Sequence, residues 1–216
     1  MTDAALPETC CPRERPTIWI WPGQAAYLGP SLRLDPHSGS VHCFALGVDA
    51  PFLLRVGDDE REVRSALIPP RTRHQVVSDG RMLFLYLEPD LGDDRVRTAL
   101  DVLRRHPDLS APQVAAELSL STSRFLHLFS AHAGTSFRRY RLWARMLRVA
   151  AAVAAGADLT RASAEAGFAS PSHFSDVFHD MFGLTASTLL GSNARIVLDT
   201  DSNRAPATWI TSECTS

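Results

Sequence analysis

A cluster of arginines gives this chain its clearest capacity for binding anions. All 22 basic residues of the 216-residue chain are arginines, and the formal net charge is −2. Five arginines fall within eleven residues, at Arg138, Arg139, Arg141, Arg145 and Arg148. A helix would place Arg141, Arg145 and Arg148 on one face. Such a face fits contact with phosphates. Pairing with acidic groups of the N-terminal half is the alternative interpretation.

No arrangement of residues typical of an enzyme accompanies this cluster. The sequence contains no nucleophile elbow, no glycine-rich phosphate loop and no acid/base constellation. We therefore predict no catalytic site and no cofactor. Residues 91–190 hold eleven arginines and nine acidic residues, whereas residues 1–90 hold nine arginines and twelve acidic residues. This asymmetry indicates an anionic partner only weakly, because scattered surface charge would give the same counts.

The chain also lacks the sequence signals of a membrane or secreted protein. No stretch of 18 or more apolar residues occurs. The N-terminus has neither the basic region nor the apolar region of a signal peptide. We expect a cytoplasmic protein with no membrane partner.

Two similar segments in the second half indicate that one structural unit is used twice. Residues 123–136 align with residues 172–185. The shared positions are Phe125 with Phe174, Phe129 with Phe178, and Gly134 with Gly183. The two phenylalanines of each segment are four residues apart, so they share a helix face. The glycine falls where a helix commonly ends in the left-handed conformation.

A shorter helix precedes each segment and completes a helix-turn-helix. A capping pattern at Ser110 and Gln113 starts the first unit, and Ser170 with Pro171 starts the last helix of the second. A plain bundle of helical hairpins is the alternative. The predicted helices cover residues 93–105, 112–118, 122–131, 136 to about 155, 159–166 and 171–182.

These motifs resemble the DNA-binding domain of AraC/XylS-family regulators over roughly 100 residues. The pattern reads Ala115-Ala116-x-Leu118-x-Leu120-Ser121-x-Ser123-x-Phe125 in the first unit and Ala166-Gly167-Phe168-x-Ser170-x-Ser172-His173-Phe174 in the second. The resemblance implies an all-α domain whose two second helices enter successive major grooves. A linking helix of about 20 residues spans about 30 Å, close to one turn of DNA at about 34 Å.

The resemblance also implies which residues contact DNA. Base-reading positions are Ser123, Arg124, Leu126 and His127 in the first unit, and Ser172, His173 and Asp176 in the second. The arginines Arg138, Arg139, Arg141 and Arg145 are expected at phosphates. Asp176 departs from the family, which usually has a basic residue there; a carboxylate is repelled by phosphate but can accept from cytosine N4. We therefore expect sequence reading mainly by the first unit.

The first half has the pattern of a small antiparallel β-barrel or sandwich. It resembles the cupin-like arm of AraC-type regulators at Trp21-Pro22-Gly23, Tyr27-Leu28-Gly29-Pro30, Pro69-Pro70 and His74-Gln75. This resemblance implies sensing or dimerisation, a small-molecule or metal effector, and a homodimer. The predicted strands cover residues 17–21, 31–34, 42–48, 52–56, 63–68, 74–77 and 82–87.

Imidazole and thiol side chains in this half are candidates for a metal site. The candidates are His37, His42, His74 and Cys43. The chain lacks the His-x-His pair and the glutamate of metal-binding cupins, so buried or turn histidines remain the favoured interpretation. Cys10 and Cys11 are adjacent thiols that could sense a soft metal or an electrophile, although exposed thiols without such a role are more common.

The sequence thus predicts an α+β fold. Residues 1–90 form a cupin-like sensing or dimerisation domain, residues 91–190 a double helix-turn-helix domain, and residues 191–216 a disordered tail. The predicted function is a sequence-specific regulator that binds double-stranded DNA through the major groove, and RNA polymerase if it activates. A metal-dependent cupin enzyme fused to a helical domain and a non-specific architectural DNA binder are the alternatives.

Overall fold

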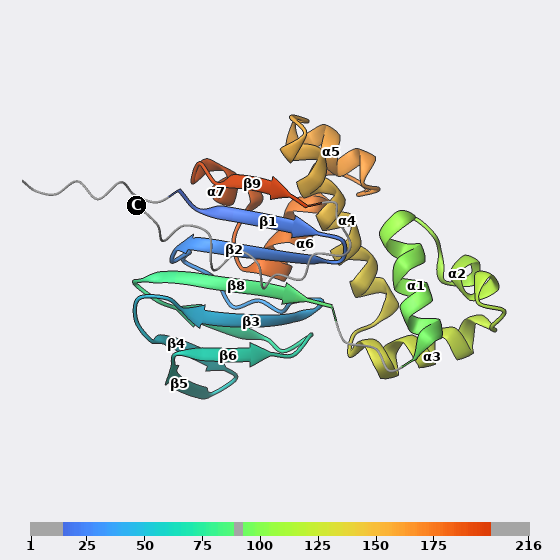
Figure 1. The fold of residues 1–216 in the computed structure, drawn as a ribbon, viewed down its shortest axis with the longest axis horizontal. Helices are drawn as coiled ribbons and strands as arrows, with labels where there is room; N and C mark the ends of the chain where they lie inside the picture. Colours follow the sequence, from blue (N-terminus) through green and yellow to red (C-terminus); the bar gives the residue numbers. More distant parts are fainter. Residues whose placement is uncertain (1–14, 89–92, 200–216) are drawn as a thin grey trace, which may run out of the picture.

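The computed structural model describes residues 15–88 and 93–199, which form two β-sheets followed by a set of helices (Figure 1). The larger sheet has the strand order β6-β3-β8-β2-β1-β9, and the smaller has the order β5-β4-β7. The strands of the larger sheet are β1 (Thr17–Trp21), β2 (Gln24–Pro30), β3 (His42–Gly47), β6 (Ser65–Ile68), β8 (Arg81–Leu87) and β9 (Arg195–Leu198). Those of the smaller sheet are β4 (Phe52–Val56), β5 (Asp59–Val63) and β7 (His74–Val77).

Side chains that alternate along the strands fill the space between the two sheets. Successive residues of a strand point to opposite faces, so every second residue enters this core. Ala45 and Met82 of the larger sheet are fully buried there, and Phe52 of the smaller sheet is 1% exposed. The β-rich half followed by a helical half confirms the predicted fold class.

The helices follow the sequence signals closely. They are α1 (Asp94–Arg105), α2 (Ala111–Glu117), α3 (Thr122–Ala133), α4 (Phe137–Ala154), α5 (Leu159–Glu165), α6 (Pro171–Phe182) and α7 (Ala186–Gly191). Asp93 caps α1 by accepting the backbone N–H of Arg95 at 2.8 Å. Helix α7 is the one helix in the described residues that the sequence did not predict. None of the helices in the described ranges is long and apolar enough to cross a membrane.

Helix α4 joins the two halves, because one of its faces packs against the larger sheet. The indole Nε1 of Trp143 donates to the carbonyl oxygen of Gly23 at 2.9 Å. Tyr140 donates its hydroxyl to the carboxylate of Glu88, which also pairs with Arg104. One hydrophobic cluster therefore includes both strand and helix residues. The halves share a core rather than meeting as two closed domains.

Two strand predictions were wrong. Residues 31–34 form no strand; β2 lies just before them, between β1 and β8. The predicted strand over residues 63–68 is two strands, since β5 ends at Val63 and β6 begins at Ser65. The hairpin of β4 and β5 turns at Gly57, which has a positive φ of 60°. Strand β5 escaped notice because its residues are charged and exposed, as suits an edge strand.

The start of the predicted disordered tail is ordered instead. Strand β9 pairs in parallel with β1, and the backbone N–H of Arg195 donates to the carbonyl oxygen of Pro16 at 2.8 Å. The edge of β1 offers backbone hydrogen-bond partners to β9. The polar composition of the tail does not indicate such pairing. Residues 200–216, and the predicted domain boundary between residues 90 and 91, lie outside the described residues.

Candidate nucleic-acid interface

The first helix-turn-helix is built from α2, a tight turn and α3. The backbone N–H of Ser110 donates to Oε1 of Gln113 at 2.8 Å, as the capping pattern predicts. The turn passes through Ser119, whose φ is +54°. Ser121 begins α3 by accepting the backbone N–H of Arg124 at 3.3 Å, and Gly134 ends it at φ +64°.

Aromatic rings fix the buried face of α3. Phe125 and Phe129 are both fully buried, with ring centroids 5.8 Å apart. Both contact Phe137 at the start of α4, and Phe129 also contacts Tyr140. The opposite face of α3 is therefore held outward. The predicted base-reading residues Ser123, Arg124, Leu126 and His127 are all exposed on it.

The second unit, α5 with α6, repeats this construction with one difference at its surface. Ser170 accepts the backbone N–H of His173 at 3.1 Å, and Pro171 is the first residue of α6. Ser172 and Asp176 are exposed, but His173 is half-buried. Its Nδ1 accepts the backbone N–H of Ala169 at 3.3 Å, and its ring lies 5.6 Å from that of Phe168. His173 thus supports the turn of its own unit.

The C-terminal end of α6 is docked on the β-rich half. The backbone N–H of Asp35 donates to the carbonyl oxygen of Gly183 at 2.8 Å, and that of Ser38 donates to the carbonyl oxygen of Asp180 at 3.1 Å. His179 Nε2 lies 3.0 Å from Oδ2 of Asp35. This contact joins segments that lie far apart in the sequence, so no local sequence pattern predicted it.

Most of the arginine cluster has partners within the chain. Arg139 donates to the carbonyl oxygen and the hydroxyl of Ser38, at 2.6 and 2.9 Å. Arg141 donates to the carbonyl oxygens of Pro107 and Asp108, both at 3.1 Å. Arg138 is exposed. The cluster therefore does not present one open row of guanidinium groups.

Asp108 is the acidic partner of the two remaining arginines of the cluster. Its carboxylate lies 3.4 Å from Nη2 of Arg145 and 3.1 Å from Nη1 of Arg148. Asp108 follows α1, so these ion pairs fix the first unit against α4. The alternative interpretation expected acidic partners in the N-terminal half. Arg145 and Arg148 instead contact Asp108, which lies in the helical half.

The metal-ligand candidates are only partly brought together. The rings of His37 and His74 are buried, with centroids 4.3 Å apart. His42 and Cys43 are neighbours on β3, so their side chains point to opposite faces. Burial raises the pKa of the Cys43 thiol to about 12. Residues 15–88 and 93–199 contain no group of three or more His, Cys, Asp or Glu that could hold a metal ion. Cys10 and Cys11 lie outside the described residues.

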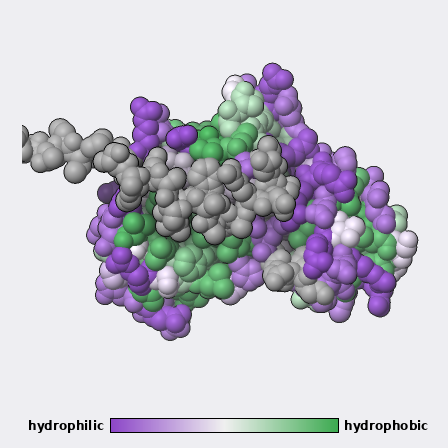
Figure 2. Space-filling model, viewed as in Figure 1, coloured by the Kyte–Doolittle hydropathy of each residue, from purple (hydrophilic) through white to green (hydrophobic). Residues whose placement is uncertain are grey.

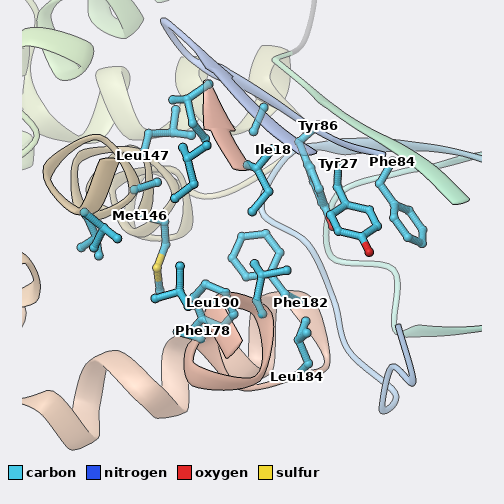
Figure 3. Close-up of a pocket in the computed structure, with 18 of the residues that line it drawn as sticks. Ile18, Tyr27, Phe84, Tyr86, Met146, Leu147, Phe178, Phe182, Leu184 and Leu190 are labelled. Atoms are coloured by element: carbon cyan, nitrogen blue, oxygen red, sulfur yellow. The ribbon is translucent and has the colours of Figure 1, made fainter. Parts of the chain in front are cut away.

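An apolar cavity of about 120 Å³ lies between the larger sheet and helices α4, α6 and α7 (Figure 3). Its lining contains no charged side chain. Tyr27 contributes a ring to the wall while its hydroxyl donates to the carbonyl oxygen of Pro30 at 2.7 Å. Phe178 and Phe182 of α6 line the same space. The second helix-turn-helix therefore forms one wall of the cavity.

Comparison with known proteins identifies the class of the helical half. The family model described as "Helix-turn-helix domain" matches residues 114–192. These residues contain both helix-turn-helix units except the first turn of α2, and the domain they form is of the AraC type. Residues 114–192 thus match an AraC-type helix-turn-helix domain. A search of curated protein sequences finds no match to the chain.

Two solved structures of ToxT share the fold of most of the chain. ToxT from Vibrio cholerae with a bound unsaturated fatty acid is 10% identical with a TM-score of 0.52, covering 77% of this chain and 94% of ToxT. An apo ToxT variant is 12% identical with a TM-score of 0.50, covering 79% and 97%. The C-terminal domain of AraT from Geobacillus stearothermophilus is 18% identical with a TM-score of 0.43, covering 53% and 97%.

Proposed function

We propose that this chain is a sequence-specific, DNA-binding transcriptional regulator of the AraC type, located in the cytoplasm. The observation that carries the proposal is the outer face of α3. It exposes Ser123, Arg124, Leu126 and His127 directly opposite two fully buried phenylalanines. A rigid helix with an exposed guanidinium, imidazole and hydroxyl matches the donors that read guanine and adenine in the major groove.

Residue roles within this interface differ between the two units. Arg124 is proposed to contact a guanine or a phosphate, and Leu126 a thymine methyl group. Ser172 and Asp176 are the exposed groups of the second unit. Among the arginines, Arg138 is the candidate for a phosphate contact, because it is exposed and no partner is seen for it within the described residues.

Gel retardation by the full chain, on fragments selected from genomic DNA, tests this function. Binding should weaken steeply as salt rises, because phosphate contacts release counterions. Arg124→Ala should cost about 1–3 kcal/mol and relax the preference at one or two base pairs. Arg55→Ala is the matched control, since Arg55 is exposed on β4 and pairs with Glu60. Absence of binding to any selected fragment at low salt would refute the proposal, and equal preference for all sequences would favour an architectural DNA binder.

We further propose that a small apolar molecule acts as effector in the cavity beneath the sheet. ToxT binds an unsaturated fatty acid in the structure described above. In this chain the cavity joins sheet residues such as Ile18 to α6 residues such as Phe178, so a ligand there would contact both halves. Because no charged side chain lines the cavity, a neutral ligand, or only the apolar tail of a fatty acid, fits it.

Binding of the neutral fluorescent dye Nile red to the full chain tests the cavity. Ala150→Phe should fill part of the space and weaken dye binding several-fold while the thermal melt is retained, since Ala150 lines the cavity from α4. Ala131→Phe is the control, because Ala131 is an exposed alanine on α3. Equal dye binding by both variants would contradict an effector site here.

Other partners follow from the regulator function. We propose a second copy of the chain as a partner, and RNA polymerase if the regulator activates. We propose that the chain is a regulator and not an enzyme, because its helical half matches a helix-turn-helix family. Metal analysis of the purified chain distinguishes these functions, because a stoichiometric transition metal would favour the enzyme.

A further inference from the structure

The short loop that joins α1 to α2 is bound by three arginines of helix α4. Arg141 donates from Nε to the carbonyl oxygen of Pro107 and from Nη2 to that of Asp108, both at 3.1 Å. The carboxylate of Asp108 lies 3.4 Å from Nη2 of Arg145 and 3.1 Å from Nη1 of Arg148. The spacing of the three arginines places them on one face of α4, so that face holds the entry to the first unit.

The carboxylate of Asp108 also lies against the turn of the second helix-turn-helix. Gly167 lies in that turn, between α5 and α6, and has a φ of +85°. A Cβ added to Gly167 would lie 2.6 Å from Oδ1 of Asp108 and 3.3 Å from Cζ of Arg145. In Figure 1, α1 to α3 lie on one side of α4 and α6 lies on the other. Asp108 therefore contacts the linking helix and both of the units that it joins.

Electrostatic attraction supports this contact. The side chain of Arg145 is only 17% exposed, so its charge is largely removed from water and needs a carboxylate nearby. Burial and the neighbouring Arg145 lower the pKa of the Arg141 guanidinium, whereas Asp108 acts to raise it. Among the described residues, Asp108 is the one acidic side chain that forms ion pairs with Arg145 and Arg148. Without its charge, the arginines of this face would repel one another.

We propose that Asp108 is a positioning residue for DNA binding, which holds the two helix-turn-helix units at the angle that lets both enter the DNA at once. The inference rests on the proposed function. Two linked binding units gain affinity only when their geometry allows both to engage together. Successive major grooves are about 34 Å apart, so both the distance and the angle between the units matter. The length of α4 sets the distance, and the contact of Asp108 with both units sets the angle.

The alternative is that the arginine face of α4 is a phosphate site that Asp108 only masks. Figure 2 shows hydrophilic residues over much of the helical half, on the right of the view, so polar contacts to DNA are also available elsewhere. A mask needs nothing more than a carboxylate. The close approach of Gly167 and the two hydrogen bonds from Arg141 to the loop favour positioning instead. The two roles predict opposite effects when the charge of Asp108 is removed.

Gel retardation by the full chain on two DNA fragments tests the proposal. One fragment contains a whole selected site, and the other is cut to the half that the first unit contacts. The wild type should bind the whole site more tightly than the half site, and Asp108→Asn should lower this ratio of affinities about tenfold, because the second unit no longer engages in register. Glu165→Gln is the matched control, since it also removes an exposed charge that pairs with an arginine, Arg161. It should leave the ratio unchanged.

Two glycine variants test the same contact from the second unit. Gly167→Ala adds a Cβ that would displace the carboxylate of Asp108, so it should lower the ratio as well. Gly156→Ala is its control, because Gly156 also has a positive φ, of +94°, but an added Cβ there meets no atom within 4 Å. Both substitutions strain the backbone in the same way. A lower ratio for Gly167→Ala alone therefore reports the contact with Asp108.

Three results would overturn the proposal. An unchanged ratio in Asp108→Asn would show that the second unit does not depend on this residue. Equal losses of affinity on both fragments would show a role in folding alone. Tighter binding to both fragments, with a steeper salt dependence than the Glu165→Gln control, would show that Asp108 masks a phosphate site.

A measurement without DNA separates these failures from failure of the proposed function. Spin labels attached at Ala131→Cys on α3 and Ala164→Cys on α5 report the distance between the units, in a chain whose cysteines outside the described residues are changed to serine. Asp108→Asn should broaden the distribution of this distance, and an unchanged distribution would overturn the proposal. A broadened distribution supports it even if the chain retards no DNA, an outcome that would refute the proposed function alone.

Discussion

The two helix-turn-helix units use the same internal construction but face different surroundings. Helix α3 is anchored by Phe125 and Phe129, both fully buried, and its other face is exposed. In α6 the equivalent residues are Phe174, which is buried, and Phe178, which is half-buried and lines the cavity. The C-terminal end of α6 also contacts residues 35–38 of the β-rich half.

This difference shows how two copies of one structural unit can serve different purposes. The phenylalanine spacing and the terminal glycine set the fold of each unit, and these are the same in both. The surface residues are free to differ, so the first unit keeps an open polar face while the second faces the sheet and the cavity. An effector in the cavity would therefore contact the second unit directly and reach the first only through α4.

The largest expected effect compares the two anchoring phenylalanines. Phe129→Ala should lower the free energy of unfolding by about 3–5 kcal/mol, because a fully buried ring leaves a cavity. Phe178→Ala should cost less than half as much, since its ring already borders empty space. Denaturant unfolding of the full chain measures both. Equal losses would show that the two units are anchored alike.

Acid should destabilise the chain through His37, which lies in the segment on which the end of α6 docks. Burial, together with the neighbouring His74, lowers the pKa of His37 to about 4, against about 6.5 in the unfolded chain. The unfolded state therefore binds more protons between these values, and stability falls as pH drops from about 6.5 to 4, by about 3 kcal/mol in total. Asp35, Arg73 and His179 are the other charged or titratable groups near His37.

The test of this pH dependence is the unfolding free energy of two histidine variants. His37→Asn should make the profile shallower between pH 4 and 6.5, because one of the two buried histidines with a lowered pKa is gone while His74 remains. His127→Asn, on the exposed face of α3, should leave the profile as in the wild type. Identical slopes for both variants would exclude His37 as the source.

A smaller effect is expected at the glycines that end α3 and α6. Both have positive φ, so alanine should cost about 1–2 kcal/mol at either position. At Gly183 an added Cβ would also lie 2.4 Å from the carbonyl oxygen of Asp35, whereas at Gly134 the nearest atom is 3.7 Å away. Thermal melts should therefore show the larger loss for Gly183→Ala. The reverse order would mean that α6 is not docked on residues 35–38.

The smallest expected effect concerns DNA affinity at the second unit. Asp176→Arg should strengthen binding on many sequences and steepen its salt dependence by about one phosphate contact, because it replaces a repulsion by an attraction. Asp176→Ala provides the comparison. If that variant loses affinity only at sites with one particular C·G pair, Asp176 reads cytosine and the units share the reading of sequence.

The parts of this structure that sequence could predict are those set by local chemistry. Caps at Ser110 and Ser170, the phenylalanine spacing and the terminal glycines are all properties of short segments. The partners of Arg139 and Arg145 are not, because Ser38 and Asp108 approach them only after the chain has folded. Strand β2 was missed for a related reason. Its Gly29-Pro30 reads as a break, yet backbone pairing on both sides holds it in the sheet.

Strand β9 has a consequence for the order in which the protein can form. It pairs with β1, so segments near opposite ends of the described chain are neighbours in one sheet. Ile196 of β9 also lines the apolar cavity. During synthesis from the N-terminus, both helix-turn-helix units are made before β9, so the edge of β1 stays unpaired until then. Such distant pairing slows folding. The wall of the cavity is thus among the last parts of the described chain to be completed.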